Sequence, residues 1–295
     1  MQDRLDPLIA ERAPWLFRTG PGTAVARRAL TGMLGYRRTV ALGTRLAPKP
    51  AAEIMETMGR LLARDVRVRG LEALPLHGPA LVVANHPTGI ADGIILHHVL
   101  APMRPDLFFF ANSDILRVLP QMSALIAPVE WRREKRSMTR TRETMAYTRN
   151  ALEAGRLGVI FPSGRLAKRR GLRLFERPWM ASAAMIARKF DVPVIPVYIR
   201  ARNSALFYLF DRIHPTLRDI TLFHETLNKA RQPFEITMGE AISAAALPAR
   251  SEEGSDMLRD ATLALSDSAA GLSLWQASRR PGWVRAPQAL MSGLN

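Results

Sequence analysis

Residues 80 to 93 carry the sequence ALVVANHPTGIADG, in which an apolar run changes abruptly into a polar turn. The first five residues have the length and composition of a buried strand, and the proline and glycine that follow are typical of a turn. His86 stands just past the strand, and Asp92 follows six positions later. In open α/β folds, sites gather at such strand ends. The stretch therefore predicts an α/β fold with a site at the edge of its sheet.

Short apolar runs alternate with helical patterns from residue 66 onward. The pattern predicts an α/β domain over residues 66–267, with a central, mainly parallel or mixed sheet flanked by helices. The predicted strands cover residues 80–84, 107–110, 124–129, 157–161, 194–199 and 234–238. The predicted helices cover residues 91–100, 137–154, 179–190, 204–212 and 255–266.

The chain of 295 residues is strongly basic, because 42 Lys and Arg face 26 Asp and Glu and leave a formal net charge of +16. Hydrophobic residues make up 47% of the sequence, which indicates a packed globular fold and argues against disorder. The charge predicts an anionic partner. The absence of cysteine excludes disulfides, thiolate metal sites and a cysteine nucleophile.

No run reaches the roughly 20 apolar residues that a membrane-spanning helix needs. The first six residues have mixed charge and lead into no apolar signal core. We therefore expect a protein on the cytoplasmic side that does not cross a bilayer.

Residues 1–65 form a predicted helical segment with patterns over residues 23–45 and 51–64. In the first pattern, four arginines lie roughly opposite an apolar face. Two interpretations remain open: association with a membrane, or packing of a surface helix on the protein's own core. Residues 268–295 are rich in Gly, Ser, Pro and Arg and are expected to form a loosely held tail.

The side chains of the first turn suit general-base chemistry. A carboxylate on one ring nitrogen of His86 would set its tautomer and stabilise the imidazolium, leaving the other nitrogen to take a proton from a hydroxyl. Asp92 is the candidate carboxylate. The alternative is a turn histidine beside an N-cap aspartate, with no contact between the two.

Two further polar segments follow predicted strands. One contains Phe161, Pro162, Ser163, Gly164, Arg165 and Lys168. Its backbone amides and guanidinium groups suit a phosphate, a carboxylate or a developing oxyanion. The other surrounds Arg132 and holds four positive charges within five residues. For both segments, the alternative is a solvated basic stretch.

Other kinds of site find no support in the sequence. Phe161 stands where a nucleophile elbow around Ser163 would need glycine. No histidine pair has the spacing of a zinc motif, and no Gly-Lys-Ser or Gly-Lys-Thr loop is present. We predict no metal and no bound cofactor.

Together these segments resemble the four sequence blocks of the glycerolipid acyltransferase superfamily. The first block is Asn85-His86 with Asp92, the second contains Arg132, the third covers residues 161–165, and the fourth covers residues 192–197. Features shared with the hemolysin-like branch, which is associated with ornithine-lipid and related aminolipid synthesis, are residues 203–208, Arg218, Asn228 and Lys229. The resemblance covers residues 66–242.

Two departures from the superfamily pattern bear on the acceptor. Five residues separate His86 from Asp92, where the usual block has four, as expected of the hemolysin-like branch. Ser163 replaces the glutamate of the usual Phe-Pro-Glu-Gly-Thr-Arg block, and no threonine precedes Arg165. The loss of a negative charge argues against glycerol phosphate and favours an aminolipid that carries a free 3-hydroxyacyl group.

The resemblance implies an O-acyltransferase that moves a fatty acyl group from an acyl-CoA or acyl carrier protein thioester to the hydroxyl of a lysolipid. A lyso-aminolipid of the ornithine-lipid type is the favoured acceptor, and lysophosphatidic acid is next. His86 is then the base and Asp92 its partner. The implied substrate-binding residues are Asn85, Arg132, Phe161, Pro162, Ser163, Gly164, Arg165 and Lys168.

The implied protein works at the cytoplasmic face of the inner membrane, bound peripherally to an anionic surface, and binds no nucleic acid. A lipid-binding homologue without activity is the first alternative. A basic nucleic-acid-binding protein is the second, and it is disfavoured because the basic runs lack interleaved aromatic residues.

Overall fold

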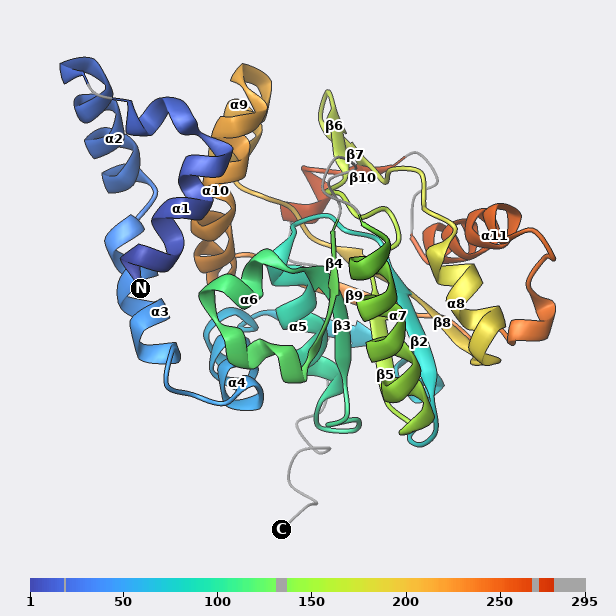
Figure 1. The fold of residues 1–295 in the computed structure, drawn as a ribbon. Coiled ribbons are helices and arrows are strands. Elements are labelled where there is room, and N and C mark those ends of the chain that lie inside the picture. The colour runs from blue at the N-terminus through green and yellow to red at the C-terminus, as the bar shows by residue number, and fades with distance from the viewer. Residues whose placement is uncertain (19, 131–136, 267–270, 279–295) are drawn as a thin grey trace, which may run out of the picture.

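A seven-stranded mixed sheet forms the centre of the computed structural model, which describes residues 1–18, 20–130, 137–266 and 271–278 (Figure 1). The strand order is β1-β9-β8-β2-β5-β3-β4. Strands β8, β2, β5, β3 and β4 run parallel, and β9 with its parallel neighbour β1 runs the opposite way. The bounds are β1 Val66–Arg69, β2 Ala80–Ala84, β3 Phe108–Asn112, β4 Ile126–Val129, β5 Leu157–Ile160, β8 Val194–Arg200 and β9 Phe234–Met238. The predicted mixed α/β architecture is confirmed.

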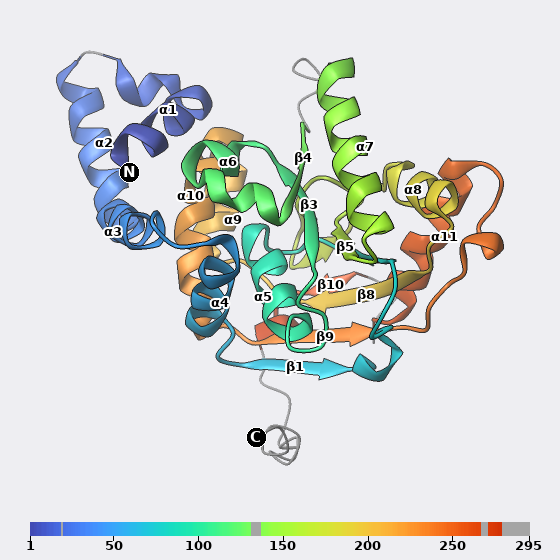
Figure 2. The ribbon, with the colours of Figure 1, turned by 60° about the horizontal axis from the view of Figure 1, so that its bottom comes forward.

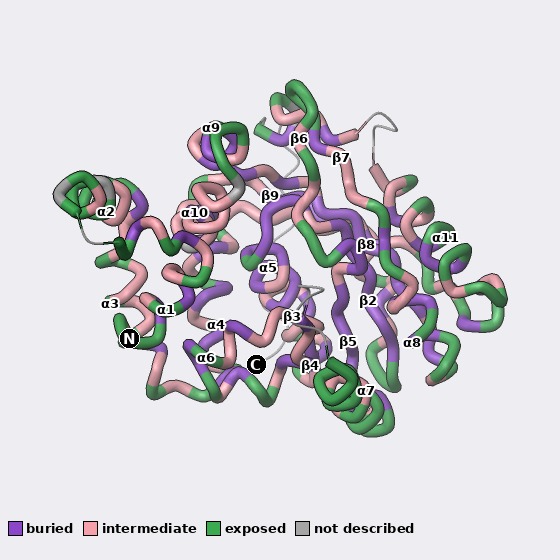
Figure 3. The backbone as a smooth tube through the Cα atoms, turned by 45° about the horizontal axis from the view of Figure 1, so that its top comes forward, coloured by how far each residue is buried: buried purple, intermediate pink, exposed green. Residues whose placement is uncertain are grey.

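Helices cover both faces of the sheet (Figure 2). On one face α4 (Ala51–Leu62) packs on α5 (Ile90–Leu100), and on the other lie α7 (Met138–Glu153), α8 (Ser182–Phe190) and α11 (Ser251–Ala264). Strand β2 has apolar side chains on both faces of the sheet. Val82 belongs to the apolar core on the first face, and Leu81 and Val83 belong to the core on the second face. A strand covered on both faces is apolar without a break. Figure 3 shows these central strands as buried.

The N-terminal segment folds into α1 (Gln2–Arg12), α2 (Pro21–Met33) and α3 (Tyr36–Leu46). The predicted continuous helix over residues 23–45 is wrong, because the chain leaves the helix at Leu34 and takes φ +64° at Gly35. Buried leucines of α1 and α3 join the same apolar core as the sheet. Of the two interpretations, packing on the protein's own core is therefore correct for α1 and α3. Helix α2, in contrast, leaves apolar side chains exposed.

A small antiparallel sheet lies beyond the end of β5. It contains β6 (Lys168–Arg170), β7 (Arg173–Phe175) and β10 (Leu272–Ser273). The expected loose tail is wrong for residues 271–278, because Leu272 pairs with Leu174 and is buried. The remaining residues of that tail lie outside the described part of the chain.

Three further helices complete the described chain: α6 (Asp114–Val118), α9 (Ala205–Ile213) and α10 (Pro215–Asn228). The sequence patterns missed α1, α6, α10, β1 and the small sheet. The strand predicted over residues 124–129 begins at Ile126, since a 3₁₀ turn occupies Pro120–Ala124. None of the helices within the described residues has both the length and the apolar character needed to cross a membrane.

Candidate active site

The turns that follow β2, β5 and β8 meet at one edge of the sheet. These three strands are parallel neighbours with β2 in the middle, so their carboxyl ends lie side by side. β3, the next strand in sequence after β2, lies beyond β5 on one side of β2, whereas β8 pairs with β2 on the other side. The crevice at such a switch in strand order is where open α/β sheets bind ligands.

His86 and Asp92 meet at this edge. Nδ1 of His86 lies 2.9 Å from Oδ2 of Asp92, whose side chain is fully buried. The ring is not aligned for a regular hydrogen bond with this oxygen, and catalytic pairs often tighten only when substrate binds. Nε2 is then the ring nitrogen left for a substrate hydroxyl.

Asp92 also caps the helix that follows the turn. Its carboxylate accepts hydrogen bonds from the backbone N–H groups of Thr88 (2.9 Å) and Gly89 (3.0 Å) and from the Thr88 hydroxyl (2.5 Å). The N-cap of this helix is Gly89, and Asp92 stands at the third helical position, so the interpretation of Asp92 as the N-cap residue is wrong. The expectation that the aspartate has no contact with the histidine is also wrong. The cap holds the carboxylate in place beside the ring.

The main chain of His86 is held as firmly as its ring. The ring stacks on Phe161 with centroids 4.3 Å apart and an interplanar angle of 28°. The backbone N–H donates to Oε2 of Glu176 at 3.2 Å, and the carbonyl accepts from the N–H of Ala167 at 2.9 Å. Segments more than 70 residues downstream thus position the candidate base.

The turn after β5 is closed by its own hydrogen bonds. The N–H of Gly164 donates to the carbonyl of Phe161 at 2.9 Å, and the hydroxyl of Ser163 donates to the carbonyl of Arg165 at 2.8 Å. The Gly164 N–H is therefore bonded within the turn, which argues against a role for this amide among the backbone amides expected to receive an anion or a developing oxyanion. Ser163 is buried, and its neighbours Pro162 and Gly164 line the cavity in its place.

Glu176 supplies an acidic group that the sequence blocks did not predict. It lies directly after β7, and its carboxylate accepts from His86 and from the indole N–H of Trp179 at 3.1 Å. Burial raises the pKa of this carboxyl, and the hydrogen bonds oppose that rise. Glu176 is not among the residues that line the cavity, so it does not contradict the inference that Ser163 removes a negative charge beside the acceptor.

Asn85 was predicted to bind substrate, but it acts as a clamp between strands. Its side-chain N–H donates to the carbonyl of Ile199 at 2.9 Å, and its oxygen accepts from the Ile199 N–H at 2.6 Å. Asn85 is 4% exposed, and both its NH₂ group and its oxygen bind the backbone of β8, so the structure places its side chain within the sheet.

Basic side chains line the polar end of the cavity that contains His86, and this end is called the mouth. Arg165 and Lys168 lie there as predicted, and the fold adds Arg169, Arg177 and Arg218, which the sequence blocks did not single out as substrate ligands. Arg132 lies outside the described residues.

The mouth also carries acidic groups. Arg218 pairs with Asp211 at 3.1 Å and with Asp219 at 2.8 Å. Burial works against the charge of Arg218, but the two carboxylates outweigh it and raise the pKa. For Arg177, burial and the charges of Arg165 and Arg218 lower the pKa. The mouth therefore contains several closely spaced positive charges and also two negatively charged carboxylates.

A cavity of about 950 Å³ runs from this mouth past His86 into an apolar pocket. The apolar part is walled by side chains of α1, α3, α4 and α6, including Leu5, Leu8, Leu46, Met55, Met58 and Ile115. The volume lies at the upper end of the usual range for small-molecule sites. The N-terminal helices, read from the sequence as a separate segment, thus form one wall of the site.

Known proteins support an acyl-transfer chemistry for this arrangement. The model of the family described as Acyltransferase matches residues 65–200, which include the turns after β2 and β5. A lyso-glycine lipid O-acyltransferase of Phocaeicola vulgatus is 24% identical over 200 residues, covering 66% of this chain and 70% of the relative. Its counterpart in Bacteroides thetaiotaomicron is 22% identical, covering 66% and 72%. The chain is thus similar to acyltransferases over the part that carries the turns after β2 and β5.

Among solved structures, the 1-acyl-sn-glycerophosphate acyltransferase PlsC of Thermotoga maritima aligns with a TM-score of 0.47 and 14% identity. The alignment covers 82% of this chain and 95% of that one. The similarity to the Acyltransferase family indicates an acyl donor and an acceptor in general terms. Within the described residues, no three His, Asp or Glu side chains are grouped as a metal site requires.

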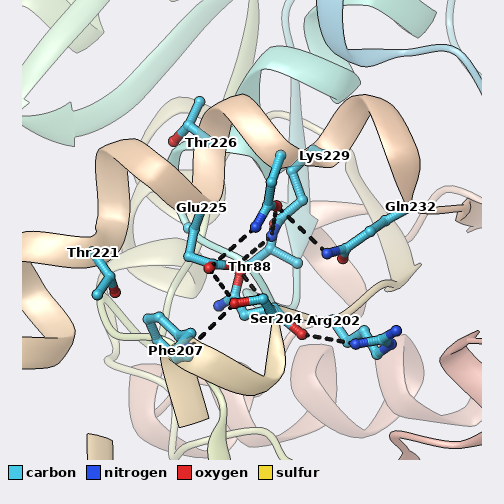
Figure 4. Close-up of polar contacts among 12 residues, drawn as sticks. Thr88, Arg202, Ser204, Phe207, Thr221, Glu225, Thr226, Lys229 and Gln232 are labelled. Carbon is cyan, nitrogen blue, oxygen red and sulfur yellow. Dashed lines mark hydrogen bonds and ion pairs between the residues drawn. The ribbon is translucent and has the colours of Figure 1, made fainter. Parts of the chain in front are cut away.

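A buried polar cluster lies next to the candidate site (Figure 4). Nζ of Lys229 lies 3.0 Å from Oε2 of Glu225, and both side chains are almost wholly buried. The carboxylate of Glu225 also accepts from the backbone N–H of Ser204 at 2.8 Å and from its hydroxyl at 2.5 Å. The cluster thereby joins α10 to the turn after β8, and the charge of Lys229 also acts on Asp92.

Proposed function

We propose that the protein transfers a fatty acyl group from an acyl-CoA or acyl carrier protein thioester to the hydroxyl of a lyso-aminolipid, an amino acid that carries an N-linked 3-hydroxyacyl chain. The observation that carries the proposal is the position of His86 and Asp92, where an apolar pocket meets an arginine-rich mouth. The names of the two relatives support the same acceptor class.

In the proposed reaction, Nε2 of His86 takes the proton of the acceptor hydroxyl as its oxygen attacks the thioester carbonyl. A C–O bond forms, and the resulting tetrahedral intermediate expels the thiolate as the C–S bond breaks. The imidazolium returns the proton to the leaving sulfur, and Asp92 stabilises the positive ring between these steps. No acyl-enzyme is required, because both substrates meet at one site.

The mouth suits the head group of an amino-acid lipid. Arg165 and Arg177 offer guanidinium groups to its carboxylate, for which arginine has the matching fork geometry. The carboxylates of Asp211 and Asp219 offer partners to a second, cationic group of the head. This mixed charge favours an ornithine-type head group over lysophosphatidic acid, which is anionic alone.

The apolar pocket suits a fatty chain. It is lined by leucine, isoleucine and methionine side chains of the N-terminal helices and of α4. Burial of each methylene contributes about 0.8 kcal/mol, so a chain held there contributes strongly to substrate binding. The N-terminal segment then serves the reaction directly, besides any contact with lipid.

One side of the molecule suits peripheral binding to an anionic membrane at the cytoplasmic face. Helices α2 and α9 and the β6–β7 turn lie on this side, at the top of Figure 1 and facing the viewer in Figure 3. Their exposed apolar side chains are Val25, Met33, Leu172, Leu209 and Ile213. Exposed arginines of the same elements are Arg27, Arg28, Arg170 and Arg212. Each basic side chain near an anionic surface contributes about 1 kcal/mol.

Vesicle flotation tests the membrane proposal. We expect binding to vesicles that contain anionic lipid at low salt and release at high salt, because salt screens the charges. A double variant, Leu209→Ser with Ile213→Ser, should reduce binding. Absence of binding to anionic vesicles at low salt contradicts the proposal.

A transfer assay tests the chemistry. The donor is a labelled acyl thioester, and the acceptors are lysophosphatidic acid and the 3-hydroxyacyl derivatives of ornithine and glycine. His86→Ala should lower kcat by about 10²- to 10⁴-fold, the usual contribution of a general base. Activity that His86→Ala leaves intact contradicts the mechanism, and binding without transfer across the panel favours the lipid-binding alternative.

A second arm of the assay tests the carboxylate site. Arg165→Ala should lower kcat/KM for the free acid by about 10- to 100-fold, since a charge-assisted hydrogen bond is worth roughly 1.5 to 3 kcal/mol. The methyl ester of the same acceptor should respond little. Arg149→Ala, at an exposed position on α7, is the matched control. An equal loss for acid and ester excludes a carboxylate contact at Arg165.

A further inference from the structure

Glu176 joins three segments that are far apart in the sequence. Its Oε2 accepts from the backbone N–H of His86 in the turn after β2, and its Oε1 accepts from the indole of Trp179 just before α8. The N–H of Met180, the residue after Trp179, donates to the carbonyl of Pro162 in the turn after β5 at 3.0 Å. Glu176 thus connects the turn of the candidate base to the segment that is bonded to the turn of the candidate anion site.

The side chain stands behind the reaction site. The cavity is lined on this side by His86, Phe161 and Pro162, and Glu176 is held by groups that face the protein interior. Each of its two oxygens accepts a hydrogen bond from an N–H group, so both oxygens of the buried carboxyl have a partner. Such a group does not touch substrate, but it acts through the main chain of His86.

We propose that Glu176 is a positioning residue of the acyltransferase, which sets the register between the turn of His86 and the turn of Ser163. The proposal rests on the proposed role of His86 as the base. The carbonyl of His86 is bonded to Ala167, so Glu176 supplies the second of two main-chain contacts that hold this residue. Without it, the turn can shift relative to Phe161 and Asp92.

The size of the expected effect follows from the geometry of proton transfer. Reacting groups must lie within about 3 to 3.5 Å of each other, and a displacement of about 1 Å can cost 10²-fold in rate. The carboxyl also has a feature that a test can use. Its two oxygens both accept from N–H groups, whereas glutamine has one oxygen acceptor and one NH₂ donor.

In Glu176→Gln, the NH₂ group of the glutamine therefore faces one of the two N–H donors, and these two groups cannot form a hydrogen bond. If its oxygen accepts from His86, its NH₂ faces the indole N–H of Trp179. Trp179→Phe removes that indole donor and leaves an aromatic ring in the core. The pair of substitutions, singly and together, forms a double-mutant cycle that measures the hydrogen-bond arrangement itself.

The experiment measures kcat, KM and the thermal unfolding midpoint of all four proteins in the acyl-transfer assay, with the parent and His86→Ala as reference points. We expect Glu176→Gln to lower kcat about 10- to 100-fold with KM changed less than about threefold. Trp179→Phe alone should lower kcat less than about fivefold, and the double variant should return to the level of Trp179→Phe. Glu143→Gln, at an exposed position on α7, is the matched control.

Three results overturn the proposal. Glu176→Gln with kcat within about twofold of the parent shows that the carboxylate is not needed. Additive losses in the double variant, in proportion to loss of folded protein, show a role in stability alone. A rise in KM at unchanged kcat shows a role in binding. If parent and His86→Ala are equally active, the proposed base has failed, and that failure is distinct from these three.

Discussion

The imidazole of His86, which follows β2, stacks on the ring of Phe161, which follows the neighbouring strand β5, with centroids 4.3 Å apart. Stacked aromatic pairs contribute about 0.5 to 1.5 kcal/mol beyond their buried area. Phe161→Leu keeps an apolar side chain and removes the ring face. We expect kcat for acyl transfer to fall about 2- to 12-fold.

The control for this substitution is Phe190→Leu, a partly buried phenylalanine at the end of α8 in a separate cluster. It should leave kcat unchanged. An unaltered kcat in Phe161→Leu would show that the other contacts of His86 hold the ring without the stack.

The buried pair of Glu225 and Lys229 predicts a large effect on stability. Lys229→Met leaves the carboxylate of Glu225 buried without its counter-charge, which typically costs about 3 to 5 kcal/mol. Adding Glu225→Gln removes that charge and should recover at least half of the lost unfolding free energy. Urea unfolding followed by circular dichroism measures both.

The exposed pair of Glu56 and Arg60, also four residues apart on a helix, is the matched control. Arg60→Met should change the unfolding free energy by less than about 0.5 kcal/mol, as expected of surface ion pairs. Equal effects at the buried and exposed pairs would contradict the burial argument.

His97 on α5 predicts a dependence of stability on pH. Burial, and secondarily the charge of His98, lowers the pKa of His97 to about 4. The unfolded chain keeps the ordinary pKa of about 6.5. Between these two values the unfolded state binds a proton that the folded state does not, so stability falls as the pH drops from about 6.5 to about 4.

The expected contribution over this range is on the order of 2 to 3 kcal/mol. His97→Leu should reduce the loss of thermal stability between pH 7 and pH 4.5 relative to the parent. His77→Gln, at an exposed histidine, serves as the control. A pH dependence identical in His97→Leu and the parent contradicts the assignment.

Asn85 provides a prediction that separates a structural role from a substrate contact. In Asn85→Asp, a carboxylate oxygen faces the buried carbonyl of Ile199 in place of an N–H donor. We expect the unfolding free energy to fall by about 2 to 4 kcal/mol, while KM of the remaining folded enzyme stays within about twofold. Asn150→Asp on the exposed side of α7 is the control. A tenfold rise in KM without loss of stability would restore the substrate role.

Much of the fold follows from local pattern. The predicted strands match β2 and β9 to the residue, and the other predicted strands differ from the observed ones by one or two residues at one end or, for β3, at both ends. Periodicity reports which side of an element is buried. It missed β1, whose four alternating valine and arginine residues make only a short strand signal. It joined α2 to α3 because periodicity does not show that Gly35 takes a positive φ and ends the helical conformation.

The candidate base and its carboxylate were predictable for a local reason. His86 and Asp92 lie on one short turn and the first turn of α5, so six residues of sequence confine the distance between them. The sequence also determined that positive charge would follow the strand ends, since Arg165 and Lys168 are close to β5 in the chain.

What only the tertiary structure decided is which distant groups meet that turn. Glu176 is 90 residues from His86, and Ile199 is 114 residues from Asn85. Their contacts depend on the sheet order, in which β5 lies between β2 and β3 and β8 pairs on the other side of β2. The apolar wall from the N-terminal helices depends on packing in the same way. The local pattern specifies that a face of an element is buried but not which element covers it, because the hydrophobic effect is non-directional and many apolar partners can cover the same face.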